Sequence, residues 1–533
     1  MINDINRIQN QKIEIEPRKT DKKTDDVKPV DIRDKFNSTE AIEKRKLVLL
    51  QIDGLSHKAL KYAMKEGHAP NIKKLVESDK YALSPFRCGI ATVTIPVLAS
   101  LFYGVELPGN DWYDKESGQH VDGIMYETKL REDLAKKGEK GILSQGAVFS
   151  SPLSGGATNT AMVVNPLKES KNEVGVLRTL IKEAKKDIKL LKKGGYSLTK
   201  TAWNFVRDIF KARSWMKKEG VSRTKLDKLA PIMMSLNHNI IEKVACEGLK
   251  EAIEQGLPTM YCDFAAYDEK AHYFGAMSKE SMEMLRTIDD KVGQVAGKAE
   301  ESKDNYEVLV FSDHGQTPSE LFEDVYKTKP GDMIKNFARN VATSYDREFK
   351  EDDIVFTDAY SLGNVYFNFS KQKVDLDAVE NHHPGLADFL THHPGIGLVV
   401  GAQDKNVIMK SKEGTLEVSP DGSKKVTGKN PLTSYGDENV LSDQIVDYMN
   451  LKTGGDVVIF GAYEKGKVMD FNDNFSLKSL HGGIGGEQTK PFIISQTDMP
   501  IKGEEITEAK QLHDLHKKYR KYLEGYDNQG KLE

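Results

Sequence analysis

Short apolar runs of strand length, separated by helical patterns, constrain the fold of this 533-residue chain more than any other feature. The first runs from Lys46 to Ile52 and ends in Asp53-Gly54. Continuous apolar runs of this length are typical of parallel strands that are buried on both faces. Similar runs recur at residues 259–264, 307–311, 395–400, 456–460 and 491–494. The alternation predicts an α/β fold, with a large, mostly parallel sheet sandwiched between helices.

Polar residues directly follow two of these runs. Asp53 ends the first run, and the stretch FSDHGQT places Asp313 and His314 just after the run at 307–311. Ligands of α/β proteins bind beyond the carboxyl ends of parallel strands, so we expect these side chains at one rim of the sheet. An Asp-Gly pair at a strand end often marks only a turn, and a metal site needs partners from elsewhere in the chain.

Further sequence blocks supply such partners. In YCDFAAYDEKAH, Asp268 and His272 are four residues apart, which places both on one face of a helix. His481 lies in a glycine-rich loop before the last apolar run. Three aspartates and three histidines form a mixed oxygen and nitrogen set, which suits two divalent ions, zinc before manganese. A fifth block, ATVTIPVLASLFYG, contributes the hydroxyls of Thr92 and Thr94.

In their order along the chain, these five blocks resemble those of the alkaline phosphatase superfamily, and most closely its type I phosphodiesterase/nucleotide pyrophosphatase branch. The resemblance covers about residues 46–130 and 250–500, and it implies the α/β sandwich of that superfamily. It also implies two metal ions, a first held by Asp268, His272 and His481 and a second held by Asp53, Asp313 and His314.

The nucleophile of the family is a threonine, serine or cysteine beside the second metal, at the N-terminus of a helix. It stands before a proline and ten residues before a glycine. Thr94 satisfies both conditions with Pro96 and Gly104, and Thr92 satisfies neither. The resemblance therefore predicts Thr94 as the catalytic residue, which also contacts a metal. It predicts a hydrolase of small phosphoric esters that works through a phosphoryl-threonine intermediate.

Two positions depart from the nucleotide pyrophosphatases. Ile95 stands where that group has an aromatic residue that stacks on the base, and Val97 stands where it has an asparagine that contacts the phosphate. Both changes argue against a nucleotide substrate, and neither affects the predicted metal ligands. We therefore predict a phosphodiesterase. Four alternatives stay open: a phosphomonoesterase, a phosphonate hydrolase, a phosphomutase on the same metal frame, and a non-catalytic metal- or anion-binding protein.

The predicted catalytic domain spans residues 45–500 and has polar segments on both sides. Residues 1–44 are rich in lysine and nearly free of aromatic residues, which predicts a disordered arm. Residues 501–533 predict a C-terminal helix, on which we expect His513 and His516 to be solvated.

A basic helical insertion is predicted from about residue 150 to residue 245. Residues 168–228 contain 18 Lys/Arg against 7 Asp/Glu. Three interpretations stay open: a solvated cap whose apolar stripe packs on the core, a cap that attracts anionic substrates, and a peripheral membrane contact. The last interpretation rests on aromatic residues among the lysines, namely Trp203, Phe205, Phe210 and Trp215.

Charge and cysteine content bear on partners and compartment. A net charge of −4 gives the chain no global affinity for nucleic acid, so no nucleic-acid partner is expected. The first residues carry no export signal. The sequence contains no run of 18 apolar residues, so no membrane span is predicted. Cys88, Cys246 and Cys262 form no metal or disulfide spacing, which fits a reducing compartment. We therefore predict a cytoplasmic protein.

Overall fold

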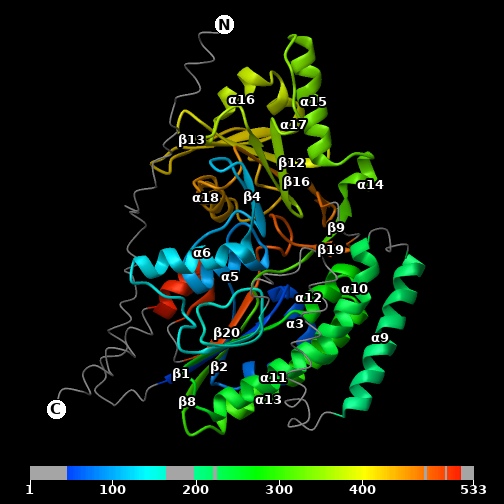
Figure 1. Cartoon of the computed structure of the whole chain (residues 1–533), viewed down its shortest axis with the longest axis vertical. Coiled ribbons are helices and arrows are strands. Elements are labelled where there is room, and N and C mark those ends of the chain that lie inside the picture. Colours follow the sequence, from blue (N-terminus) through cyan, green and yellow to red (C-terminus); the bar gives the residue numbers. More distant parts are fainter. Residues whose placement is uncertain (1–44, 164–196, 220–224, 473–476, 498–500, 518–533) are drawn as a thin grey trace, which may run out of the picture.

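Two seven-stranded sheets, each covered by helices, lie one above the other along the long axis of the computed structural model (Figure 1). The structure describes residues 45–163, 197–219, 225–472, 477–497 and 501–517. The predicted arm at 1–44 lies outside the described residues.

The first sheet contains four of the six strands that the apolar runs predict. It is formed by β1 (Arg45–Ile52), β2 (Tyr81–Pro85), β5 (Ala147–Ser151), β6 (Asn159–Val163), β7 (Thr259–Phe264), β8 (Asn305–Phe311) and β20 (Phe492–Gln496). The four predicted strands are β1, β7, β8 and β20. Their order is β2-β20-β8-β1-β7-β5-β6. The five strands from β8 to β6 are parallel, whereas β20 pairs antiparallel with β8 and β2. The predicted α/β fold with a mostly parallel sheet is confirmed.

Helices cover both faces of this sheet, which is why its central strands β1, β7 and β8 are largely apolar. One face is covered by α3 (His57–Glu66), α4 (Pro70–Val76), α11 (Glu242–Glu254), α12 (Ala266–Phe274) and α13 (Lys279–Glu300). The other is covered by α5 (Thr94–Tyr103), α6 (Gly123–Lys136) and a helix at 509–517. Alternate residues of β1 enter the two cores, with Val48 on one side and Leu49 on the other.

The second sheet is antiparallel. It is formed by β10 (Ile354–Ala359), β11 (Leu362–Phe367), β12 (Ile396–Gln403), β13 (Asn406–Ser411), β14 (Gly414–Val418), β15 (Lys424–Gly428) and β16 (Val457–Gly461), in the order β10-β11-β16-β12-β13-β14-β15. Its pairings are all antiparallel. One face is covered by α15 (Pro330–Ser344), α16 (Leu376–His382) and α17 (Leu386–His392), and the other by α18 (Glu438–Met449).

The apolar runs at 395–400 and 456–460 do form strands, β12 and β16, but these lie in the second sheet rather than in the parallel one. Helices bury both faces of this sheet as well, so its central strands show the same continuous apolar pattern. Periodicity therefore identifies a strand buried on both faces without revealing its direction or its sheet.

Smaller elements connect the two sheets. A four-stranded sheet contains β9 (Thr317–Leu321), β17 (Tyr463–Glu464), β18 (Lys467–Asp470) and β19 (Ser479–Leu480). A hairpin contains β3 (Asp111–Asp114) and β4 (Gln119–Asp122), and the short helix α14 (Phe322–Tyr326) follows β9. Because β9 follows the end of β8, this small sheet lies next to the carboxyl-end rim of the first sheet.

The basic region contains two described helices, α9 (Leu198–Glu219) on the outside of the molecule and α10 (Lys225–Leu236) between α9 and α12 (Figure 1). A π-helical segment, Asn237–Ile241, joins α10 to α11. Residues 164–196 of the predicted insertion lie outside the described residues. Among the residues that the structure does describe, no helix is both long and apolar enough to cross a membrane.

The helix at 509–517 corrects one expectation. His513 and His516 are buried rather than solvated, with 5% and 2% of their surfaces exposed. Nδ1 of His513 donates a hydrogen bond to the carbonyl oxygen of Leu101 at 3.1 Å. The helix packs its apolar side, including Leu512, on α5, and His513 faces that contact.

Candidate metal centre

The carboxyl ends of two parallel strands bring three predicted ligands together. Strands β1 and β8 are neighbours, with Gln51 opposite Phe311, so Asp53 and the Asp313-His314 pair follow adjacent strand ends. Nε2 of His314 lies 3.5 Å from Asp53 Oδ1 and 3.2 Å from Asp313 Oδ2. All three side chains are buried.

The other three predicted ligands come from α12 and from the loop after β19. Nε2 of His272 lies 3.1 Å from Asp268 Oδ2 and 3.1 Å from His481 Nε2. Nδ1 of His272 donates to the carbonyl oxygen of Ser479 at 2.9 Å, and Nδ1 of His481 donates to that of Thr92 at 2.7 Å. These backbone bonds orient both imidazoles so that Nε2 faces the cluster, as is usual for metal-binding histidines.

The six predicted ligands form one continuous cluster. Two groups of three have all their candidate ligand atoms within 4.8 Å of one another, namely Asp268, His314 and His481, and Asp53, Asp313 and His314. The rings of His314 and His481 stack with centroids 3.7 Å apart. The geometry thus differs in one respect from the predicted partition: His314 belongs to both close groups, and His272 adjoins the first through Asp268 and His481.

Gly54 is required by a close approach between two parts of the cluster. A Cβ atom at this position would lie 2.1 Å from Asp268 Oδ1, and the residue has a φ of +70°. Its N–H donates to Asp313 Oδ1 at 3.2 Å. The Asp53-Gly54 pair therefore does more than turn the chain, because the glycine lets Asp268 reach the other carboxylates.

Two carboxylate oxygens of the cluster, Asp53 Oδ1 and Asp313 Oδ2, are buried without a hydrogen-bond partner among the described residues. Burial and the neighbouring Asp313 charge raise the pKa of Asp53 well above its usual value. Burial also holds the pKa of His481 well below its usual value, and His314 adds to this effect. Orphaned carboxylate oxygens beside imidazole nitrogens are the donors that a divalent cation requires, so these residues fit a metal centre.

The hydroxyl of Thr94 lies beside this cluster. Thr94 is the first residue of α5, and its Oγ1 is 3.4 Å from His314 Nε2. The N-cap residue Val93 makes no side-chain capping hydrogen bond. The first N–H groups of α5 therefore keep their capacity to bind an anion, which adds to the favourable field at the start of a helix.

Thr92, the other candidate hydroxyl, has a different environment. It is fully buried, its hydroxyl donates to the carbonyl oxygen of Gly483 at 3.0 Å, and it accepts from the N–H of Gly482 at 2.8 Å. Both bonds fasten the loop that carries His481. The hydroxyl of Thr92 is thus used in holding the loop.

Sequence reasoning missed two polar residues at the cluster. Nε2 of Gln316 donates to the carbonyl oxygen of Asp268 at 3.1 Å and also contacts its carboxylate. Asp263, at the end of β7, is 3% exposed and hydrogen-bonds to Asp53. The available signals were the position of Gln316 directly after Asp-His-Gly and an acid inside the apolar run 259–264.

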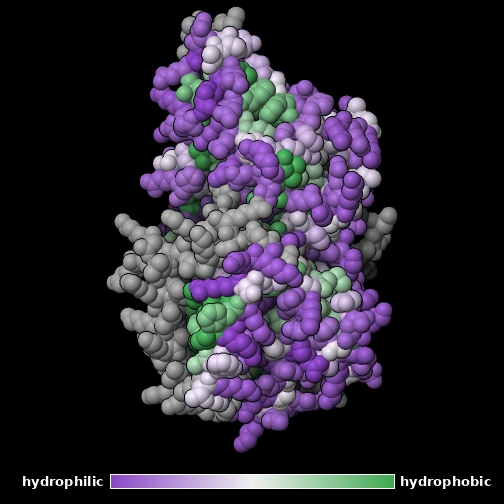
Figure 2. Space-filling view, turned by 90° about the vertical axis from the view of Figure 1, so that its right-hand side faces the viewer, coloured by the Kyte–Doolittle hydropathy of each residue, from purple (hydrophilic) through white to green (hydrophobic). Residues whose placement is uncertain are grey.

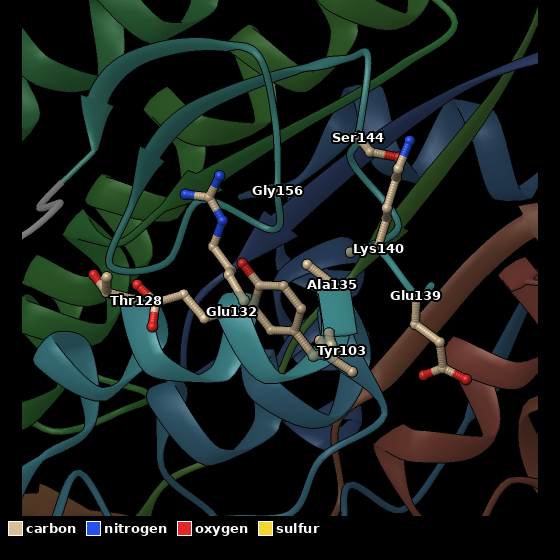
Figure 3. A pocket seen from close by; sticks show the side chains of 11 residues that line it. Tyr103, Thr128, Glu132, Ala135, Glu139, Lys140, Ser144 and Gly156 are labelled. Atoms are coloured by element: carbon tan, nitrogen blue, oxygen red, sulfur yellow. The ribbon is translucent and has the colours of Figure 1, made fainter. Parts of the chain in front are cut away.

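A separate cavity of about 490 Å³ lies at the other end of α5 (Figure 3). Its wall includes Tyr103, Arg131 and Lys140, and it contains none of the seven predicted site residues. The hydroxyl of Tyr103 donates to the carboxylate of Glu127, which also accepts from the N–H of Ser154 at 2.7 Å. The metal-ligand cluster and this cavity are therefore distinct, because they lie at opposite ends of one helix.

Residues 47–368, more than half of the chain, match the model of the family described as type I phosphodiesterase / nucleotide pyrophosphatase. The matched range contains all predicted site residues except His481: Asp53, Thr94, Asp268, His272, Asp313 and His314. No curated protein matches the sequence at a significant level.

Several solved structures resemble the chain. Murine ectonucleotide pyrophosphatase / phosphodiesterase 5, in an inactive form in complex with AMP, is 12% identical, with 89% of this chain and 94% of that chain covered and a TM-score of 0.46. Phosphonoacetate hydrolase from Sinorhizobium meliloti 1021 in complex with phosphonoacetate is 13% identical, with 90% and 96% covered and a TM-score of 0.49.

The α/β fold and the family match define an enzyme class, the metal-dependent hydrolases of phosphoric esters. The chain belongs to the type I phosphodiesterase / nucleotide pyrophosphatase family. The family prediction and the enzyme class are thereby confirmed, and small phosphate esters are the substrates of this class.

Proposed function

We propose that this chain hydrolyses small phosphodiesters with Thr94 as its nucleophile, beside two divalent ions. The observation that carries the proposal is the place of the Thr94 hydroxyl. It stands at the uncapped start of α5, 3.4 Å from Nε2 of His314, the histidine that both close ligand groups share. A hydroxyl, a helix N-terminus and a buried ligand cluster at one point are the parts that phosphoryl transfer to a side chain needs.

Six residues would hold the ions: Asp268, His272 and His481 the first, and Asp53, Asp313 and His314 the second. The mixed carboxylate and imidazole set favours zinc, whereas manganese prefers a larger share of oxygen ligands. When bound, such ions stabilise negative charge on phosphate oxygens and lower the pKa of a neighbouring hydroxyl.

The chain's own groups then account for the two steps. Thr94 Oγ1 loses its proton to solvent and forms a bond to phosphorus, while the bond from phosphorus to the leaving oxygen breaks and that oxygen takes a proton from solvent to give the alcohol. The first N–H groups of α5 point at the phosphate oxygens and hold the ester for attack. Water then cleaves the phosphoryl-threonine and restores the hydroxyl.

The residues after Thr94 favour a substrate without a stacked base. Ile95 and Val97 are buried in the core beneath α5, 8% and 3% exposed. Neither residue offers an exposed aromatic surface or an amide to a ligand. A small diester that is recognised mainly through its phosphate suits this site better than a nucleotide does.

The test is a comparison of aryl phosphate diesters and monoesters under one set of conditions, with metal content measured in parallel. We expect faster turnover of the diesters. A strong preference for monoesters would place the chain among phosphatases or phosphomutases. Preference for a phosphonate would indicate a phosphonate hydrolase, and metal binding without any turnover would indicate a non-catalytic metal-binding protein.

We also propose a reducing, cytoplasmic setting. Cys88, Cys246 and Cys262 are all free thiols and all buried. Burial raises the pKa of Cys246 to about 11, which keeps this thiol protonated and unreactive. Cell fractionation is the test, and recovery of the protein outside the cytoplasm would contradict the proposal.

A further inference from the structure

Helix α9 exposes large apolar side chains along its outer face. Trp203 is 68% exposed, Phe210 is 66% exposed and Val206 is 46% exposed. Positions 203, 206 and 210 fall on one stripe because a helix has 3.6 residues per turn. Within the described part of the chain, no other helix or strand has more than one exposed large hydrophobic side chain. The stripe is therefore unusual for this molecule.

The stripe lies in the middle of a basic surface. All six Lys and Arg residues between 199 and 218 are exposed: Lys200, Arg207, Lys211, Arg213, Lys217 and Lys218. Helical spacing places Lys211 on one side of the stripe and Arg213 on the other. The single acid in this range, Asp208, is half-buried and accepts a hydrogen bond from Asn239 at 3.0 Å.

The opposite face of α9 anchors the helix. The ring of Trp215 packs on that of Phe274, the last residue of α12, with centroids 3.9 Å apart. Met216 is 1% exposed, and Ser235 of α10 donates to the carbonyl oxygen of Phe205 at 2.8 Å. Trp215 therefore faces the protein, and the aromatic groups free to meet a partner are Trp203 and Phe210.

Figure 2 faces the side on which α9 lies in Figure 1 and shows several small hydrophobic patches within a mostly hydrophilic surface. We propose that the outer face of α9 binds a membrane surface that contains anionic phospholipid. Aromatic side chains entering the interface, with cationic groups at headgroup level, are the chemistry of a helix that lies in the membrane plane.

Two other occupants fit the surface less well. Residues 164–196 precede α9 and contain nine Lys/Arg against four Asp/Glu, so they repel this basic face rather than complement it. Single-stranded nucleic acid would stack on Trp203 and Phe210, but aliphatic Val206 between them offers no stacking surface. Lipid accommodates all three side chains.

Vesicle co-sedimentation of the full chain tests the proposal. Vesicles of phosphatidylcholine alone are compared with vesicles that also contain phosphatidylserine. The variants are Trp203→Ser/Phe210→Ser, which removes the stripe, and Lys211→Gln/Lys217→Gln, which removes charge beside it. The matched control is Met125→Ser/Tyr345→Ser, because these side chains are 52% and 62% exposed on other elements. Turnover of a water-soluble aryl diester verifies that each variant is folded.

We expect the wild type to sediment with the anionic vesicles and to dissociate as salt is raised. Each α9 variant should lose partitioning on the order of tenfold or more, with its turnover of the soluble diester unchanged. The control should bind as the wild type does. Absence of wild-type binding, or an equal loss in the control, would overturn the proposal. So would binding of a single-stranded oligonucleotide that depends on Trp203 and Phe210 while vesicles are ignored.

Discussion

The two large sheets have seven strands each, yet all seven predicted site residues lie outside the antiparallel one. In the first sheet the parallel strands β1, β7 and β8 end at the same edge, so the residues that follow them converge. In the second sheet neighbouring strands run in opposite directions, so their ends alternate between two edges. The two sheets have the same number of strands and both are covered by helices, yet only the first forms the site. Strand direction decides whether the polar residues that follow the strands lie at the same edge.

The second sheet nevertheless supports the site through one turn. The turn between β10 and β11 packs against the loop that follows His481. A Cβ at Gly482 would lie 1.8 Å from the carbonyl oxygen of Ala359, and Ser361 donates to Gln488 Oε1 at 2.9 Å. The reacting groups therefore lie at the rim of the parallel sheet, and the antiparallel sheet supports the loop that carries His481.

The largest effect is expected at the rim, for Thr94→Ala. Turnover should fall by several orders of magnitude, because the nucleophile is lost. Metal content should be largely retained, since the six Asp and His ligands remain. Thr94→Ser should keep part of the activity, because a primary hydroxyl can attack the same phosphorus. Rates and metal content measured together provide the test.

Thr92→Ala is the matched control for this prediction. It removes two hydrogen bonds to the His481 loop, so we expect a loss of about 1–3 kcal/mol in the free energy of unfolding, with turnover still measurable. An inactive Thr92→Ala beside an active Thr94→Ala would identify the other hydroxyl as nucleophile. Full activity of both would require water to attack directly.

The next effect lies in the antiparallel sheet and concerns stability alone. Asp456 is fully buried and accepts hydrogen bonds from Lys115 Nζ at 2.7 Å and from the N–H groups of Phe367 and Val374 at 2.8 Å. Asp456→Ala leaves the buried ammonium group of Lys115 without its carboxylate partner and should cost about 3–5 kcal/mol in the free energy of unfolding. Turnover per folded molecule should not change, which chemical denaturation and active-site titration can establish.

The exposed acid Asp388, on α17 in the same unit, is the control for Asp456, and its replacement by Ala should leave the unfolding curve unchanged. A loss of turnover in folded Asp456→Ala would break the proposed division between the two sheets, since the antiparallel sheet would then contribute to the chemistry itself.

Gly482→Ala tests the contact between the two regions. The added methyl group must displace the loop from Ala359, and the φ of +111° adds strain. We expect turnover to fall about 100-fold, because His481 moves relative to the other ligands. Gly466→Ala is the control: its φ is +77°, but no atom lies within 4 Å of the added Cβ. It should cost about 1 kcal/mol of stability with normal rates.

The smallest effect concerns the helix layer of the first sheet, away from the rim. Burial lowers the pKa of His516 from about 6.5 to about 4. At pH values below about 6.5, the folded chain therefore binds fewer protons than the unfolded chain. Its contribution to stability is complete above about pH 6.5 and is lost as pH falls toward 4. His516→Leu should remove this loss and gain about 2 kcal/mol at about pH 5 relative to wild type. Thermal melts of wild type and variant across this pH range provide the test. Melting temperatures of the two proteins that change in parallel with pH would contradict the prediction.

The sequence predicts the parallel strands and the rim residues for the same physical reason. Strands β1, β7 and β8 are buried on both faces, which makes them continuous apolar runs, and their ends carry the polar residues. Asp53, Asp313 and His314 could be grouped because parallel strand ends meet.

Other features depend on packing that no local pattern encodes. Strands β12 and β16 have the same apolar pattern and belong to another sheet, so direction is invisible in the sequence. His516 is buried because its helix docks on α5. Asp263 was missed because a single acid in a strand does not by itself indicate a site. Its proximity to Asp53 is visible only in the folded structure.

Elemental analysis of protein purified without chelator tests whether the buried cluster is a two-metal centre. We predict two divalent ions per chain, with zinc the expected metal. It also predicts that His481→Ala weakens the first site and leaves the second, because Asp53, Asp313 and His314 form a group of their own. Fully active protein that contains no metal would contradict the account, and so would a His481→Ala variant that keeps both ions as tightly as the wild type.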